Sequence, residues 1–318
     1  MKYQIFTNHI MERMKEHFHE QITVSVREVS RNNGIVLTGL TFSQKNINIS
    51  PTIYLDCFYE EYCQGRAIDE IVEEIKMIYS RSKMEENLNM DFFTNYDKAK
   101  TNIVYKLVNY EKNQGMLEDV PHRRFLDLAI VFYYILEREE FSQATILIRN
   151  NHLDMWNVTT DEIYGVASVN TPKLLKYTVS GMLEVLAELD EDSFCRCKNR
   201  GGRCFGKECG SPEDYMKNCV RKDETGMYVL SNTERLNGAV SILYSGVLEA
   251  FANKLGQDLF ILPSSVHEVI LIPNDNHVEK KKLEDMVREV NMTQLEPEEF
   301  LSNTIYYYST ERKKVVSL

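Results

Sequence analysis

The sequence has no uninterrupted apolar run of eighteen residues, so no segment is long enough for an ordinary transmembrane helix. Its opening residues, MKYQIFTNHIMERMKEHFHEQ, also lack the apolar centre of a signal peptide. We therefore expect a cytoplasmic protein that makes no membrane contact. In that compartment cysteine thiols are kept reduced.

Proline and glycine are scarce, with seven and fourteen among 318 residues, which argues against a long linker or a disordered chain. Hydrophobic residues make up 43% and charged residues 27%, as is typical of a globular protein. Positive charge is also in short supply, and the net charge is −11. A general nucleic-acid binder is disfavoured, because phosphate groups would repel the chain as a whole.

Recognisable catalytic motifs are absent from the sequence. His267-Glu268 is not followed by the second histidine of a helical H-E-x-x-H zinc motif. Ser264-Ser265 lies outside any G-x-S-x-G turn. The run GGRCFG is not followed by the Lys-Ser/Thr pair of a phosphate-binding loop. The sequence alone therefore identifies no reaction.

Hydrophobic periodicity predicts interleaved helices and strands. Apolar residues at steps of four predict a helix over residues 3–18. Residues 22–29 and 35–42 alternate around Asn32-Asn33-Gly34, which predicts a β-hairpin. Residues 237–256 read as one apolar helix that ends at Gly256. The pattern predicts an α+β fold with mixed or antiparallel sheets, flanking helices and a cysteine-rich insertion.

Turn signals and changes in composition divide the chain into four parts. In the second part, Thr159 or Thr160 is expected to cap a helix that Pro172 interrupts. The expected parts are an N-terminal α+β unit (1–92), a central α+β unit (93–194), a cysteine-rich insertion (195–222) and a C-terminal α+β unit (223–318).

Five of the seven cysteines gather in one short stretch, and in a reducing cytoplasm such clustering favours metal binding over disulfides. Their spacing, C-x-C-x6-C-x4-C-x9-C, departs from the usual C-x2-C zinc knuckle. Metal binding, disulfides and free thiols therefore all stay open. Zinc is the one cofactor that the residues suggest. It would be held by four of these five: Cys195, Cys197, Cys204, Cys209 and Cys219.

The cysteine-rich segment is a basic island on an acidic chain. Residues 195–222 carry a net charge of +5, which leaves −16 on the remainder. Nucleic acid is a conceivable partner only through this segment, 196–222, where basic side chains would contact phosphates. The residues concerned are Arg196, Lys198, Arg200, Arg203 and Lys207.

His267 and Glu268 are the weak candidates for catalysis, as a general acid or base at a cleft. The region 258–273 reads as two strands joined at 263–265, with both candidates in the second strand. The structural alternative is a salt bridge or polar network, and it is favoured. A buried carboxylate needs a partner, so we expect Glu268 to accept hydrogen bonds from a basic or backbone group.

Long stretches of the chain resemble a family of cytosolic proteins from anaerobic gut Firmicutes that is catalogued as a domain of unknown function. The resemblance is carried by NNGIVLTGL, PTIYLDCFYEEYCQG, DLAIVFYYIL and NNHLDMWNVTTDEIYGVASVNTPKLL. It continues through YVLSNTERLNGAVSILYSGVLEAFANKLGQDLFILPSSVHEVILIP and MVREVNMTQLEPEEFLSNTIYYY. The resemblance implies single-chain bacterial proteins and supplies no activity. Residues 195–222 depart from the family pattern, which marks them as an insertion.

Three functions stay open from the sequence. The first is a non-catalytic binding or regulatory protein whose protein or small-molecule partner is unknown. The second is an enzyme with its site near His267 and Glu268. The third is local nucleic-acid contact through the basic cysteine segment. The absence of motifs favours the first, although new enzymes also lack known motifs.

Overall fold

A computed structural model describes residues 1–19, 22–45, 47–48, 50–83, 90–136, 145–192, 211–275 and 279–318. The chain divides into two compact units, Met1–Phe92 and Phe93–Leu318, here called the N-terminal and C-terminal units. Helices alternate with antiparallel sheets throughout, so the predicted α+β class is confirmed. Among the described residues, no helix has the length and apolar character needed to cross a membrane.

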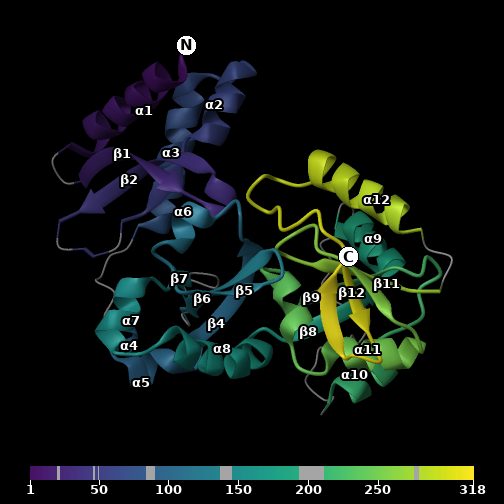
Figure 1. Ribbon diagram of the computed structural model, residues 1–318. Helices are drawn as coiled ribbons and strands as arrows, with labels where there is room; N and C mark the ends of the chain where they lie inside the picture. Colours follow the sequence, from purple (N-terminus) through teal and green to yellow (C-terminus); the bar gives the residue numbers. More distant parts are fainter. Residues whose placement is uncertain are drawn as a thin grey trace. The chain divides into compact units, whose positions relative to one another are not determined.

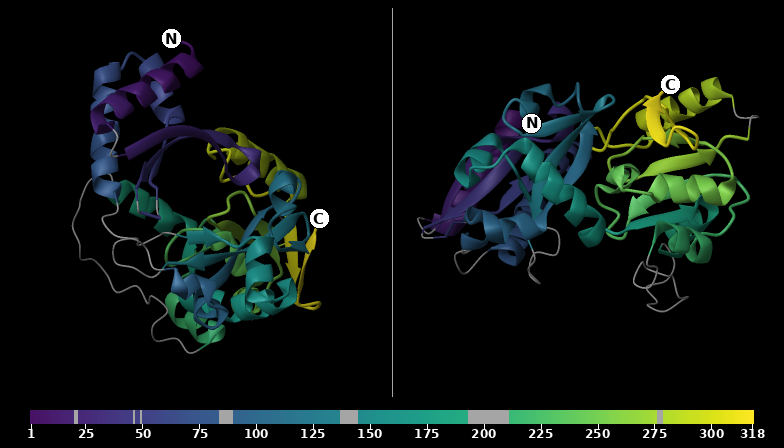
Figure 2. Two further views of the ribbon diagram at one scale, coloured as in Figure 1. Left: turned by 90° about the vertical axis from the view of Figure 1, so that its left-hand side faces the viewer. Right: turned by 60° about the horizontal axis from the view of Figure 1, so that its bottom comes forward.

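In the N-terminal unit, three helices pack on one three-stranded sheet (Figure 1). Strands β1 and β2 pair in antiparallel register from Ile22–Gln44 to Ser30–Val36, which confirms the predicted hairpin. The left view of Figure 2 shows the helices grouped on one side of the purple strands. The elements are α1 (Tyr3–Phe18), β1 (Ile22–Ser30), η2 (Asn32–Gly34), β2 (Val36–Gln44), β3 (Thr52–Tyr54), α2 (Asp56–Cys63) and α3 (Ile68–Ser82).

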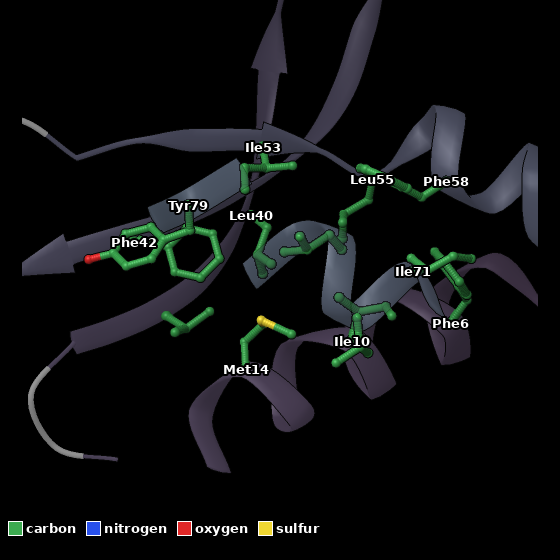
Figure 3. Packing of buried hydrophobic residues seen from close by; sticks show 13 residues of the cluster. Phe6, Ile10, Met14, Leu40, Phe42, Ile53, Leu55, Phe58, Ile71 and Tyr79 are labelled. Atoms are coloured by element: carbon green, nitrogen blue, oxygen red, sulfur yellow. The ribbon is translucent and has the colours of Figure 1, made fainter. Parts of the chain in front are cut away.

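The core of this unit forms where the apolar stripe of α1 meets the sheet. Phe6, Ile10 and Met14 are fully buried, as their spacing of four residues predicts for one helix face. Figure 3 shows Met14 pointing toward Leu40 of β2 and Phe6 beside Ile71 of α3, within one buried cluster. Burial of this stripe, rather than helix propensity, holds α1 in place.

The first part of the C-terminal unit is a four-stranded antiparallel sheet. Strand β6 lies between β4 on one side and β5 and β7 on the other. Seven of its eight residues are buried, at 5% exposure or less. The elements are α4 (Asp91–Thr94), α5 (Tyr96–Ala99), η3 (Lys100–Asn102), β4 (Ile103–Asn109), α6 (Gln114–Leu117), β5 (His122–Phe125), β6 (Leu128–Ile135), β7 (Thr145–Leu147), α7 (Asn150–Trp156) and α8 (Thr160–Leu174).

Helix α8 begins as predicted and ends later than predicted. Thr159 caps it: its hydroxyl accepts from the Glu162 N–H, and the Glu162 carboxylate accepts from the Thr159 N–H. Pro172 was expected to interrupt this helix, and that expectation was wrong, because the helix continues to Leu174. The proline lies in the last turn, where it removes one backbone N–H and the chain leaves the helix two residues later.

A six-stranded antiparallel sheet forms the second part of the C-terminal unit, in the order β13-β12-β10-β11-β9-β8. Phe260 and Leu262 pack with residues of α12 on one face, while Tyr228 contacts Phe251 of α11 on the other. The elements are β8 (Tyr177–Gly181), α9 (Met182–Asp192), α10 (Pro212–Cys219), β9 (Tyr228–Asn232), η4 (Gly238–Leu243), α11 (Val247–Leu255), β10 (Leu259–Leu262), β11 (Val269–Pro273), α12 (Lys280–Thr293), β12 (Tyr306–Ser309) and β13 (Lys314–Ser317).

The region predicted as one helix over 237–256 is broken into η4 and α11. Gly246 lies between them with φ of 77°, a left-handed conformation that an α-helix cannot contain. The apolar spacing was compatible with one helix because both pieces bury their apolar side chains. The break places the start of α11 at Val247.

Helix α10 lies inside the range that was predicted as a cysteine-rich insertion. Its Tyr215 and Met216 side chains are buried, and the Tyr215 hydroxyl accepts from the Val179 N–H of β8. The Lys254 ammonium donates to the carbonyls of Met216 and Val220 at the end of α10. The described end of that range is therefore packed into the C-terminal unit.

Asp127 joins the turn between β5 and β6 to the chain segment before β12. One carboxylate oxygen accepts from the Ser302 hydroxyl at 2.5 Å and from the Thr304 hydroxyl at 3.2 Å. The other accepts from the Tyr306 hydroxyl, whose ring is fully buried. Asn109 adds a second tie by donating its side-chain amide to Leu301 O at 2.9 Å. These bonds connect the two sheets of the unit.

Candidate functional site

His267 and Glu268 lie in the loop between β10 and β11, not in a strand. The prediction that placed them in the second strand was wrong, because β11 begins at Val269. The loop pairs instead with a segment far along the chain: Val266 N–H donates to Glu299 O at 2.8 Å, and Leu301 N–H donates to Ser264 O at 2.9 Å. This distant partner shapes the loop, and local sequence does not reveal it.

The His267 ring bridges two parts of the C-terminal unit. Its Nδ1 accepts from the Asn237 N–H at 3.3 Å, and its Nε2 lies 3.5 Å from Glu299 Oε1. A backbone N–H can only donate, so Nδ1 supplies the lone pair and the ring proton is on Nε2, facing Glu299. With both nitrogens engaged, the imidazole serves as a structural bridge rather than as a free base.

The backbone of His267 is held as closely as its ring. Its N–H donates to Ser265 Oγ at 3.0 Å, and its carbonyl accepts from Ser231 Oγ at 2.8 Å. Gly238 packs directly against this arrangement: a Cβ there would lie 2.3 Å from Ser231 Oγ and 2.5 Å from His267 O. The close approach of η4 to the loop therefore depends on a residue without a side chain.

Replacing Gly238 with alanine should lower the free energy of unfolding by about 1–3 kcal/mol, since backbone atoms must move to admit the methyl group. Urea unfolding monitored by circular dichroism would measure the change. The matched control is Gly165→Ala within α8, where the added Cβ meets no atom within 4 Å. There the substitution should stabilise by about 0.5–1 kcal/mol, as alanine favours the helix. Equal effects at the two positions would contradict the close-packing argument.

Glu268 differs from His267 because its carboxylate has no hydrogen-bond partner among the described residues. The expectation that a basic or backbone group would donate to it is therefore wrong for that part of the chain. Burial is the main cause that raises the pKa of the Glu268 carboxyl, while His267 and Arg235 lower it and Glu299 raises it. The side chain is thus a half-buried acid that holds its proton more tightly than an exposed one.

We predict that Glu268→Gln stabilises the folded chain at pH 7. The pKa of the Glu268 carboxyl is higher in the folded chain than in the unfolded chain, so protonation of this carboxyl stabilises the fold. That stabilisation is fully present at pH values below the unfolded pKa. It is lost as pH rises through the folded pKa, whereas glutamine stays neutral throughout. The gain over wild type, measured by urea unfolding, should shrink as pH falls toward the ordinary carboxyl range. Glu296→Gln removes an exposed carboxylate and should change stability little. A destabilised Glu268→Gln chain at pH 7 would contradict this account.

The predicted zinc ligands lie largely outside the described residues. Cys195, Cys197, Cys204 and Cys209 are not described, and of Cys219 only the backbone, at the end of α10, is described. The basic residues Arg196 to Lys207 lie outside the described part as well. Elsewhere, the cysteines Cys57 and Cys63 are free and exposed. Within the described ranges, no group of three or more His, Cys, Asp or Glu side chains could hold a metal ion.

A cavity of about 270 Å³ lies where the start of α11 meets the β12–β13 hairpin. Sequence reasoning missed it, because it read 237–256 as one helix and so did not place a helix start here. A tyrosine, serine and glycine run just before α11 was the available signal. The polar lining consists of Tyr244, Ser245, Gly246, Glu249, Tyr308 and Lys313.

Two opposite charges stand at the edge of this cavity. The Lys313 ammonium lies 2.5 Å from Glu249 Oε1, and its side chain is 65% exposed. This hydrogen bond raises the pKa of Lys313, so the ammonium keeps its charge at neutral pH. Lys313 occupies the hairpin turn with φ of 48°, and Glu249 lies in the first turn of α11. The pair offers both a donor and an acceptor to an incoming molecule.

Tyr308 contributes a hydroxyl to the same cavity from a ring that is only 5% exposed. Among the described residues, this hydroxyl has no hydrogen-bond partner. Burial and then the nearby Glu249 carboxylate raise the pKa of Tyr308, so the hydroxyl keeps its proton. Because this hydroxyl lines the cavity, it is available to hydrogen-bond with a molecule that enters.

Comparisons with known proteins identify the family to which the chain belongs. Neither the curated proteins nor the solved structures gave a match to this chain. A family model matches residues 3–310, almost the whole length. The resemblance to a family of unknown function is thereby confirmed: the chain belongs to DUF5688, a family of unknown function.

Proposed function

We propose that this chain is a non-catalytic binding protein that holds a small molecule in the cavity between α11 and the β12–β13 hairpin. The observation that carries the proposal is the Tyr308 hydroxyl, which lies on a buried ring, lines the cavity and has no partner among the described residues. The hydroxyl can donate a hydrogen bond to a molecule that enters the cavity.

The surroundings of the cavity favour binding over chemistry. Lys313 and Glu249 form an ion pair with each other. The His267 imidazole, a catalytic candidate by sequence, has both ring nitrogens engaged. A general base must have a free lone pair within reach of the proton it removes. The polar groups of the cavity are therefore suited to recognising a molecule rather than to transforming it.

A ligand panel sorted by charge tests the proposal. It would contain free amino acids, simple carboxylates, simple amines, sugar phosphates and nucleosides, screened by ligand-observed NMR. Val315 lines the cavity, whereas the next residue on β13, Val316, points to the other face of the strand. We expect at least one compound to bind wild type and Val316→Trp, but not Val315→Trp. Equal binding to both tryptophan variants, or no binding by any compound, would contradict the proposal.

A second candidate is acid–base chemistry at Glu268, and the observation in its favour is the raised pKa of a half-buried carboxyl without a described partner. Such an acid keeps its proton to a higher pH than an exposed carboxyl does. If a reaction is found, Glu268→Gln should lower kcat by about 100-fold or more while the chain stays folded. Unchanged kcat in that variant would remove Glu268 from the reaction.

We also propose, from the sequence alone, that four of the five clustered cysteines hold one zinc ion. Elemental analysis of chain purified without metal-affinity resin should give about one zinc per chain, since thiol clusters in a reducing compartment bind metal tightly. Removal of the ion with a chelator should lower the melting temperature. Five rapidly reacting thiols in this segment, in a sample free of metal, would show that the cysteines are free instead.

A further inference from the structure

We infer that the free edge of β13 binds an extended acidic segment of a partner protein, which adds to the six-stranded sheet as a further strand. This partner is separate from the small molecule proposed for the cavity. Two independent features of the chain indicate it: backbone groups of β13 that face away from β12, and cationic side chains at the start of the strand.

The backbone of β13 offers hydrogen-bonding groups on the side away from β12. Leu318 N–H donates to Ile305 O at 3.0 Å, in continuation of the β12–β13 register. In an antiparallel pair every second residue bonds to the partner strand, so Val316 faces β12 as Leu318 does. The N–H and C=O groups of Val315 and Ser317 therefore point away from β12, and no described residue bonds to them.

A second polypeptide backbone matches these groups. A β-strand presents an N–H and a C=O on the same side at every second residue, with a repeat of about 7 Å. An extended peptide has the same alternation of donors and acceptors, so it can pair along the edge by strand addition. Val315 and Val316 are half-buried and lie on opposite faces of β13, so apolar side chains of the added strand can pack beside either one.

The charges at the start of β13 select an acidic partner. Arg312 and Lys314 are exposed, and neither forms an ion pair with a described residue. Lys313 lies between them and pairs with Glu249, so its charge is already offset. Glu311 precedes Arg312 and forms no ion pair within the described ranges. Two unpaired cations beside a free strand edge favour carboxylates on the added strand, because complementary charges speed association and exclude partners of the wrong sign.

Three matched peptides test the inference by isothermal titration calorimetry on the full chain. The first is the acidic peptide acetyl-TVTVTDE-amide, and the second carries two lysines in place of its aspartate and glutamate. The third is the acidic peptide with N-methyl groups on its central residues, which removes the donors needed for strand pairing. The acidic peptide should bind with a Kd below about 1 mM. The other two should bind at least about ten-fold more weakly, since one reverses the charge and one lacks the backbone donors.

Ser317→Pro and Ser317→Ala form a matched pair of chain variants. Ser317 is exposed and its N–H faces away from β12, so proline removes one donor of the free edge and leaves the β12–β13 bonds in place. The alanine variant should bind the acidic peptide like wild type, and the proline variant about ten-fold more weakly at a similar melting temperature. Lys314→Gln should weaken binding and reduce its dependence on salt.

Hydrogen exchange on wild type gives a second measurement that does not depend on how the proline variant folds. The acidic peptide should slow exchange at the amides of Val315 and Ser317. The inference is overturned if the acidic peptide fails to bind at about 1 mM, or if the lysine peptide binds as tightly. It is also overturned if exchange at these two amides is unchanged in the complex. None of these results decides whether the cavity binds a small molecule, because the ligand panel tests that separately.

Discussion

Phe42→Ala is expected to lower the free energy of unfolding of the N-terminal unit by about 3–5 kcal/mol, the usual cost of truncating a buried phenylalanine. Phe42 is fully buried on β2, and its ring lies against that of Tyr79, with centroids 4.6 Å apart (Figure 3). Its ring centroid lies 5.8 Å from that of Phe18. The substitution removes the ring on which strand and helices converge. Because small units are stable by only about 5–15 kcal/mol in total, much of the unit's stability would be lost.

Val36→Ala in the same strand is the matched control. Val36 is 52% exposed, so its truncation should change the free energy of unfolding by no more than about 0.5 kcal/mol. Urea unfolding followed by circular dichroism would compare the two variants. A loss below about 1 kcal/mol for Phe42→Ala would mean that the site collapses around the missing ring or that the ring is not buried in solution.

Asp127→Ala should destabilise the C-terminal unit by about 2–4 kcal/mol. It removes the acceptor of three hydroxyls, and those of Ser302 and Tyr306 belong to residues that are at most 1% exposed. Each buried donor left unpaired costs about 1–3 kcal/mol. Burial and then the Asp127 carboxylate raise the pKa of Tyr306, so its hydroxyl stays protonated and must find an acceptor.

Asp127→Asn separates the loss of hydrogen bonds from the loss of charge. It keeps the shape and one acceptor oxygen, so it should cost less than the alanine variant. Tyr306→Phe removes a donor rather than the acceptor and should also cost less, since Ser302 and Thr304 keep their partner. Thermal unfolding of the three variants would rank them. An alanine variant as stable as the asparagine variant would show that the hydroxyls find other acceptors.

Local sequence patterns were sufficient to predict a helix or strand wherever it buries one face against neighbouring elements. The β1–β2 hairpin could be predicted because alternation and the Asn-Asn-Gly turn act within 23 residues, from Ile22 to Gln44. Helix α1 could be predicted because Phe6, Ile10 and Met14 repeat at one helix face. In both cases the spacing of the apolar residues in the sequence directly identifies the face that is buried.

Sequence patterns did not predict the conformation of a segment when residues far along the chain determine it. His267 and Glu268 were assigned to a strand because the flanking apolar residues alternate, yet their loop pairs with residues 299–302, about 33 positions further along. The cavity escaped notice for the same reason: Glu249 and Lys313 are ordinary surface charges in sequence, and only the tertiary fold brings them to 2.5 Å. The regular spacing of apolar residues also concealed the break at Gly246, because η4 and α11 both bury their apolar side chains.

The order of the six-stranded sheet has a consequence for self-association. Among the described strands, β13 pairs only with β12, so one side of its backbone presents groups that no described strand pairs and that could template another strand. The strand is only four residues long and begins with Lys314, an exposed positive charge that repels a second copy of the same edge. Chains that lack this charge are best handled dilute, because strand addition grows with concentration.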